Sequence, residues 1–176
     1  MEYIREKTLF QYMLIVILLF TSSLGEASEG NFLESPEGVV NELYQLVTFE
    51  SGHTPDWNQV KSLFIDQAVV VLRTSRENTT IFSVQGFVDD FVNFIEKYNA
   101  KQTGFKEEIK RMKSKIFEDM AHIFVLYEAS IPGSKRPPQQ GLDSFLLIKK
   151  EGRWWIVAIT NEIPKPDSPI PSDLFD

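Results

Sequence analysis

Residues 119–128 read Asp-Met-Ala-His-Ile-Phe-Val-Leu-Tyr-Glu, and their β-branched and aromatic content predicts a strand from Ala121 to Ser130. Successive side chains of a strand point to opposite faces of its sheet. One face of this strand would carry His122, Phe124, Leu126 and Glu128. The other face would carry Ala121, Ile123, Val125 and Tyr127. The second set is the more apolar, so we expect it to face the core and His122 to lie on the opposite side.

Two further strands are predicted on the C-terminal side of this segment. Leu142–Ile148 and Trp154–Thr160 are strand-like, and Lys150-Glu151-Gly152 between them is typical of a hairpin turn. A connection rich in Pro and Gly, Ile131–Gly141, precedes this hairpin. The C-terminal half is therefore expected to form antiparallel hairpins.

The N-terminal side of the chain predicts three helices. Ser35-Pro36-Glu37 is a helix start, and its apolar positions recur at helical spacing: Val39, Val40, Leu43, Leu46 and Val47. Thr54-Pro55-Asp56 starts a second helix, with Gln59 as a capping-box partner and an apolar face of Trp57, Val60, Leu63 and Phe64. Ser83 is the expected cap of a third helix, whose stripe is Phe87, Phe91, Phe94, Ile95 and Tyr98.

Three segments lie between or after these helices. Ala68–Leu72 predicts a short strand, and Thr74–Thr80 is interpreted as a polar excursion. Phe105–Phe117 is ambiguous, because its apolar residues match a helical stripe while its many Lys and Arg residues suit the solvated side of an edge strand. Periodicity alone favours a helix.

The chain has 176 residues, which is the length of one domain. Its net charge is -7, and it contains no Cys. Helices followed by hairpins predict an α+β domain with the helices on one face of a sheet. The acidic balance argues against a nucleic-acid partner, and the absence of Cys excludes disulfides, thiolate zinc sites and a cysteine nucleophile. Because metal-ligand spacings and phosphate-binding glycine loops are missing, we expect no metal, nucleotide or other cofactor.

Residues 1–27 have the order of a signal peptide: Arg5 and Lys7, an apolar run from Leu9 to Phe20, then small residues. The run is short for a membrane-spanning helix, which needs roughly 20 residues. We predict cleavage after Ala27, a short linker over residues 28–34, and a secreted or periplasmic protein that does not contact the membrane after cleavage. An uncleaved membrane anchor is the alternative.

Several motifs in their order resemble an exported bacterial branch of the nuclear transport factor 2-like, SnoaL-like superfamily. They are residues 119–128, Gly141-Leu-Asp-Ser-Phe145, Gly152-Arg-Trp-Trp155 and Pro169-Ile-Pro171. The resemblance implies a cystatin-like cone over residues 35–163, in which three N-terminal helices pack on the concave face of a bent antiparallel sheet, with a pocket at its open end. It also implies that Phe105–Phe117 is a strand. The superfamily includes isomerases, cyclases, dehydratases and non-catalytic domains, and this branch is largely of unassigned function.

The candidate catalytic residues are Asp143, Tyr127 and His122. Asp143 would be a buried carboxylic acid beside the Tyr127 hydroxyl as oxyanion donor, and His122 would be a general base. The structural alternatives are a strand-end carboxylate in water, an aromatic side chain of the sheet and an edge histidine. Alternation leaves open whether Asp143 or Ser144 points inward.

The remaining pocket candidates are polar or aromatic side chains near the expected open end of the pocket. Together with Tyr127, they are Trp57, Arg73, Glu128, Ser144 and Asn161. Salt bridging by Arg73 and core packing by Trp57 are the alternatives. Three functions remain open: a non-catalytic pocket for a small, mostly apolar molecule, which we favour; an isomerase, dehydratase or cyclase using Asp143 and Tyr127; and a homodimeric module that associates through the exposed sheet face.

The tail, residues 164–176, is rich in proline, which cannot donate a sheet hydrogen bond. We predict an extended segment that leaves the last strand after Glu162 and lies along the domain surface. Ile170, between Pro169 and Pro171, is its expected anchor. A free, disordered tail is the alternative.

Overall fold

The computed structural model describes residues 32–75, 77–165 and 167–176. The predicted signal peptide lies outside the described residues, as do residues 28–31 of the predicted linker. The other linker residues form a short 3-10 helix, η1 (Phe32–Glu34), in which Phe32 and Leu33 pack against the core. The folded domain therefore begins earlier than the expected Ser35.

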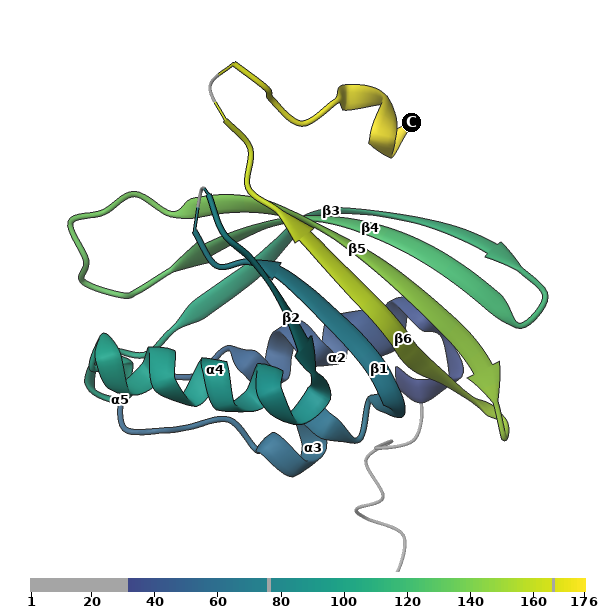
Figure 1. Ribbon diagram of the computed structural model, residues 1–176, viewed down its shortest axis with the longest axis horizontal. Coiled ribbons are helices and arrows are strands. Elements are labelled where there is room, and N and C mark those ends of the chain that lie inside the picture. Colours follow the sequence, from purple (N-terminus) through teal and green to yellow (C-terminus); the bar gives the residue numbers. More distant parts are fainter. Residues whose placement is uncertain (1–31, 76, 166) are drawn as a thin grey trace, which may run out of the picture. The chain divides into compact units, whose positions relative to one another are not determined.

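The domain is built on one curved sheet of six strands in the order β2-β1-β6-β5-β4-β3 (Figure 1). Their bounds are β1 Phe64–Arg73, β2 Thr79–Ser83, β3 Lys106–Phe117, β4 Met120–Ser130, β5 Gln139–Lys150 and β6 Arg153–Glu162. Neighbouring strands are antiparallel except β1 and β6, which run parallel. The sheet is thus mixed, whereas we expected it to be wholly antiparallel, because β1 precedes the hairpins and joins them alongside the last strand.

The helices lie together on one face of this sheet (Figure 1). Their bounds are α2 Pro36–Val47, α3 Trp57–Lys61, α4 Val84–Lys97 and the short α5 Ala100–Thr103. The predicted caps of the first three are confirmed, since the side chains of Ser35, Asp56 and Ser83 each accept a hydrogen bond from a backbone N–H two or three residues later. The second helix is shorter than predicted, because the chain turns after Lys61 and Phe64 begins β1. None of the described helices is long and apolar enough to span a membrane.

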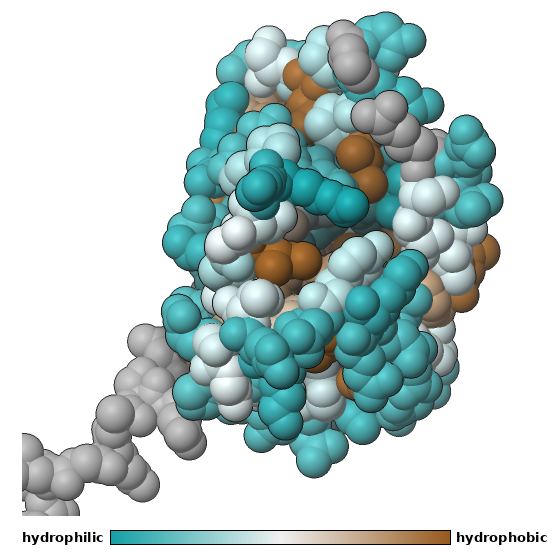
Figure 2. Space-filling model, turned by 90° about the vertical axis from the view of Figure 1, so that its left-hand side faces the viewer, coloured by the Kyte–Doolittle hydropathy of each residue, from teal (hydrophilic) through white to brown (hydrophobic). Residues whose placement is uncertain are grey.

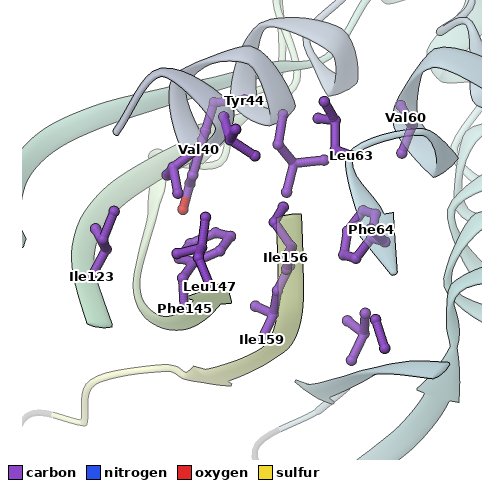
Figure 3. Close-up of a cluster of buried hydrophobic side chains, with 14 of the residues drawn as sticks. Val40, Tyr44, Val60, Leu63, Phe64, Ile123, Phe145, Leu147, Ile156 and Ile159 are labelled. Atoms are coloured by element: carbon purple, nitrogen blue, oxygen red, sulfur yellow. The ribbon is translucent and has the colours of Figure 1, made fainter. Parts of the chain in front are cut away.

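The predicted alternation along β4 is confirmed by burial. Ala121, Ile123, Val125 and Tyr127 are buried, whereas His122 and its neighbours on the other face are only partly covered. The inward side chains pack with those of β5 and β6 against α2, from which Val40 and Tyr44 reach toward the sheet (Figure 3). Each such side chain contributes about 1.5–3 kcal/mol by leaving water, so this face holds the domain together.

The helix favoured by periodicity for Phe105–Phe117 is wrong, since Lys106–Phe117 is the edge strand β3. The register between β3 and β4 jumps from Ile109↔Tyr127 to Arg111↔Leu126, which leaves Lys110 as an extra residue in a β-bulge. Because of the bulge, Ile109 and Met112 both pack against the core although they are three residues apart. In the sequence, this three-residue spacing is the same as that of apolar residues on one face of a helix.

A second edge strand, β2 (Thr79–Ser83), was missed between the predicted excursion, which ends at Thr80, and the third helix. Thr79–Ser83 pairs with the last residues of β1, from Val69 to Arg73. Most of its side chains are exposed, and Ile81 is 73% exposed. The strand therefore lacks the buried face that would have marked it in the sequence.

The tail leaves β6 at Glu162 and crosses the sheet face opposite the helices, ending in the 3-10 helix η2 (Ser172–Phe175) (Figure 1). Its anchor is Phe175, which is buried and lies 4.7 Å from the guanidinium of Arg111 on β3. Ile170, the expected anchor, is only half-buried. The choice of Ile170 was wrong, because the turn of η2 directs the side chain of Phe175 onto the sheet, whereas the flanking prolines do not do this for Ile170.

We expect the variant Phe175→Ala to lower the free energy of unfolding by about 1–2 kcal/mol, since it removes one buried ring and its cation–π contact. Thermal denaturation followed by circular dichroism measures the change. Asp173→Asn, an exposed substitution in the same turn, is the matched control. Equal melting temperatures for Phe175→Ala and the parent protein would show that the tail does not dock.

Candidate functional site

A cavity of about 720 Å³ lies between the helices and the inner face of the sheet. Its walls are largely aromatic and aliphatic, and include Leu43, Phe87, Phe91, Phe94, Phe105 and Phe145. It opens between the end of α4 and the loop that joins β4 to β5. Figure 2 faces this end of the molecule and shows a hollow with hydrophobic side chains inside it and hydrophilic ones around it. The volume falls in the range of sites for small organic molecules.

Five polar side chains, which we name the polar cluster, line this cavity from five different elements. They are Tyr44 of α2, Glu107 of β3, Tyr127 of β4, Asp143 of β5 and Asn161 of β6.

Three hydrogen bonds connect four members of the polar cluster. The Tyr44 hydroxyl donates to Oδ2 of Asp143 over 2.6 Å. The side-chain amide of Asn161 donates to Oδ1 of Asp143 over 2.7 Å and to the hydroxyl oxygen of Tyr127 over 2.9 Å. Both oxygens of the Asp143 carboxyl are therefore held, and the Tyr127 hydroxyl keeps its own proton for donation to another acceptor.

Sheet register positions these groups. Asp143 is the direct partner of Asn161 on β6, and Tyr127 is the direct partner of Gly141 on β5. A Cβ atom at Gly141 would lie 2.2 Å from the Tyr127 hydroxyl oxygen, which is far inside van der Waals contact. Gly141 is thus needed because the phenol ring lies across its backbone, close to Asn161.

Burial sets the protonation of the cluster. It raises the pKa of Asp143 to about 6, although the hydrogen bonds from Tyr44 and Asn161 act in the other direction. Burial and the charge of Asp143 raise the pKa of Glu107 to about 8. The pKa values of both tyrosines are raised mainly by burial and then by the charge of Asp143. Near pH 7 the polar cluster accordingly holds one carboxylate, one neutral carboxylic acid and two neutral phenols.

Charged side chains also line the cavity where it meets solvent. Arg73 forms an ion pair with Glu162, in which its Nε donates over 3.0 Å. Lys97, Arg136 and Asp90 are exposed. These groups are hydrated, so they interact weakly with anything held deeper in the cavity.

The structure brings together some of the candidate residues from the sequence. Asp143, Tyr127, Asn161 and Arg73 all line the cavity. The open choice between Asp143 and Ser144 is answered by burial, since Asp143 shares the inner face with Phe145 and Leu147.

Four other candidates do not line the cavity. Ser144 and His122 lie on the outer face, where Nε2 of His122 is 2.8 Å from the Ser144 hydroxyl. Glu128 also points outward, to Lys110 and Gln140. Trp57 packs against Phe91 with ring centroids 5.5 Å apart and does not reach the cavity surface. Strand alternation directs the side chains of Ser144, His122 and Glu128 away from the helices, so the outward position expected for His122 is confirmed.

Sequence reasoning missed Tyr44 and Glu107. Tyr44 lies four residues after Val40 and three before Val47, on the buried stripe of α2. Glu107 alternates with Phe105 and Ile109, so a strand interpretation of this segment would have placed it inward. Among the described residues, no three His, Asp or Glu side chains are grouped so that they could hold a metal ion.

Solved structures with the same arrangement were found by comparison of the folds. A protein of unknown function with a cystatin-like fold from Nostoc punctiforme has a TM-score of 0.57 and 9% identity, covering 76% of this chain and 90% of its own. A nuclear transport factor 2-like protein of unknown function from Pseudomonas putida has a TM-score of 0.57 and 10% identity, covering 80% and 88%. This chain has the cystatin-like fold.

A third similar structure is the putative calcium/calmodulin-dependent protein kinase type II association domain from Thiobacillus denitrificans. Its TM-score is 0.59 at 10% identity, over 76% of this chain and 98% of its own. No model of a protein family matches the sequence, and no curated protein matches it. At such identities the similarity concerns the fold, which hosts many unrelated activities, so function has to be argued from the cavity.

Proposed function

We propose that this protein binds a small, mostly apolar molecule in the cavity, with the polar cluster fixing the orientation of the ligand. The observation that carries the proposal is a cavity of about 720 Å³ whose largely aromatic wall is interrupted by one connected polar cluster. Apolar walls supply affinity through burial, and a few converging polar groups supply specificity. We also propose export of the protein through residues 1–27, so that the ligand would be met outside the cytoplasm.

Binding of the neutral dye N-phenylnaphthylamine, which fluoresces in apolar surroundings, tests this proposal. Ala129 lines the cavity, so Ala129→Phe should fill part of it and weaken dye binding by about tenfold or more. Ala158, half-buried on the outer face opposite Leu146, provides the matched control Ala158→Phe. Absence of dye binding by the parent protein, or equal weakening by both variants, would refute the cavity as a binding site.

Proton-transfer catalysis is a second candidate, favoured by one observation. The Asp143 carboxyl and the Tyr127 hydroxyl converge on the same amide group of Asn161 inside the cavity. Asp143 would remove a proton next to a carbonyl group, and Tyr127 would donate a hydrogen bond to the resulting enolate oxygen. Exchange of the acidic protons of β-tetralone in D2O, measured by mass spectrometry, should be accelerated by the protein and lost in Asp143→Asn. Equal exchange with and without protein would rule out this activity.

Homodimerisation is a third candidate, favoured by apolar side chains on the outer sheet face. Met120, Leu146 and Ile148 are 60%, 48% and 42% exposed. Such a patch on a soluble domain is a common site of self-association. Sedimentation equilibrium of the parent protein and of Leu146→Lys measures it, and a monomeric parent at all concentrations would exclude it.

A further inference from the structure

We propose that the ligand of the cavity is an organic cation, an arylalkyl amine whose ammonium group binds between the carboxyl groups of Asp143 and Glu107. This inference rests on the proposed binding function and specifies the chemical class of the ligand.

The first observation is a carboxyl group without a cation. Asp143 is held by two neutral donors, the Tyr44 hydroxyl and the Asn161 amide. Within the described ranges 32–75, 77–165 and 167–176, no Lys or Arg forms an ion pair with Asp143 or Glu107. Removing a carboxylate from bulk water is costly unless a positive charge or several donors compensate it. Asp143 has two neutral donors and no cation, so a positive charge in this part of the cavity would stabilise its carboxylate further.

The second observation is the position of Glu107. Its backbone is fixed by two hydrogen bonds with the Thr48 hydroxyl, which hold this end of β3 against the end of α2. Its side chain lines the same cavity as Asp143, near enough for the charge of Asp143 to raise its pKa. Two carboxyl groups that face one cavity repel each other when both are ionised, and an ammonium group with three donors would satisfy both.

The third observation is the aromatic wall. The rings of Phe91, Phe94 and Phe105 pack with centroids 5.3–5.7 Å apart. The ring centroids of Tyr44 and Tyr127 are 6.0 Å apart. Aromatic faces attract cations and offer flat apolar contact to another ring. The wall thus suits the ring of an arylalkyl amine, while the carboxyl groups suit its ammonium group.

The basic side chains at the opening of the cavity do not favour an anionic ligand. Arg73 is already paired with Glu162, and Lys97 and Arg136, like Asp90, are exposed to solvent. An anionic head group in the buried part of the cavity would face the like charge of Asp143 in a region of low polarity. Carboxylate ligands should consequently bind worse than amines of equal size.

Isothermal titration near pH 7.5 with three indole compounds tests the inference. Tryptamine, tryptophol and indoleacetate carry an ammonium, a hydroxyl and a carboxylate group on similar bodies. We expect tryptamine to bind at least about tenfold more tightly than tryptophol, and indoleacetate to bind most weakly. Asp143→Asn should abolish the preference for the amine but retain tryptophol binding. Asp66→Asn, the same change at an exposed residue of β1 that does not line the cavity, should retain the preference.

A pH series provides a second readout. Tryptamine stays protonated below pH 8, whereas Asp143, with a pKa of about 6, becomes neutral on acidification. The preference for tryptamine should therefore decline below about pH 6. Equal affinity for amine and alcohol, with N-phenylnaphthylamine binding intact, would overturn the amine inference and leave the proposed function standing. Failure of the dye and all three indoles to bind would overturn both.

Discussion

Near pH 9, the variant Glu107→Gln should be more stable to unfolding than the parent protein by about 2–4 kcal/mol. The pKa of Glu107 is raised to about 8 in the folded protein from an ordinary value of 4.5. Between these values the folded state binds a proton that the unfolded state has released, so the parent protein loses stability as pH rises. Gln remains neutral at every pH and avoids this loss. At about pH 4 both side chains are uncharged, and the difference should nearly vanish.

Urea denaturation at about pH 4, 7 and 9 measures the effect, and the neighbouring residue supplies its control. Glu108 is exposed and pairs with Lys106 and Lys110, and these partners lower its pKa. Glu108→Gln should therefore give a small loss of stability near neutral pH, opposite in sign to the effect at Glu107. If the free energy of unfolding of Glu107→Gln changed with pH in parallel with that of the parent protein, Glu107 would not be held in the buried, protonated form.

The elements that sequence reasoning predicted correctly depend on contacts within a few residues. The caps at Ser35, Asp56 and Ser83 bind N–H groups two or three residues away, and the alternation of β4 is a property of one strand. Such signals are complete in the local sequence. Periodicity alone did not identify β3 for the converse reason, because the bulge at Lys110 breaks the alternation that identifies a strand. The strand that the resemblance implied there is confirmed.

The polar cluster could be predicted only in part, because it is assembled by pairing between distant segments. Tyr44 and Asp143 are 99 positions apart in the sequence, and Tyr127 and Asn161 are 34 apart. The motifs supplied Tyr127 and Asp143, and Asn161 followed from its position at the end of the last predicted strand. Tyr44 and Glu107 required knowledge of which face of α2 and β3 meets those strands, and that follows from tertiary packing.

The variant Gly141→Ala should destabilise the protein by about 2–3 kcal/mol and displace the Tyr127 ring, although it adds one methyl group. The methyl group would lie 2.2 Å from the hydroxyl oxygen and 2.3 Å from the ring carbon that bears it. Gly141 is a buried residue of β5 directly opposite Tyr127 of β4, so the ring has to move to relieve the overlap. The hydrogen bond from Asn161 to Tyr127 would then be lost, and with it the orientation of the donor that faces the cavity.

A double-mutant cycle separates this clash from an effect on the backbone. Gly141→Ala should cost little in the background Tyr127→Ala, where the ring is absent. Gly86→Ala is the matched control, because a Cβ atom there would meet only ordinary contacts of 3.4 Å or more. Thermal unfolding gives the stabilities, and N-phenylnaphthylamine titration reports the cavity. A cost for Gly141→Ala that is equal in both backgrounds would place its origin in the strand backbone and would remove Gly141 as the residue that positions Tyr127.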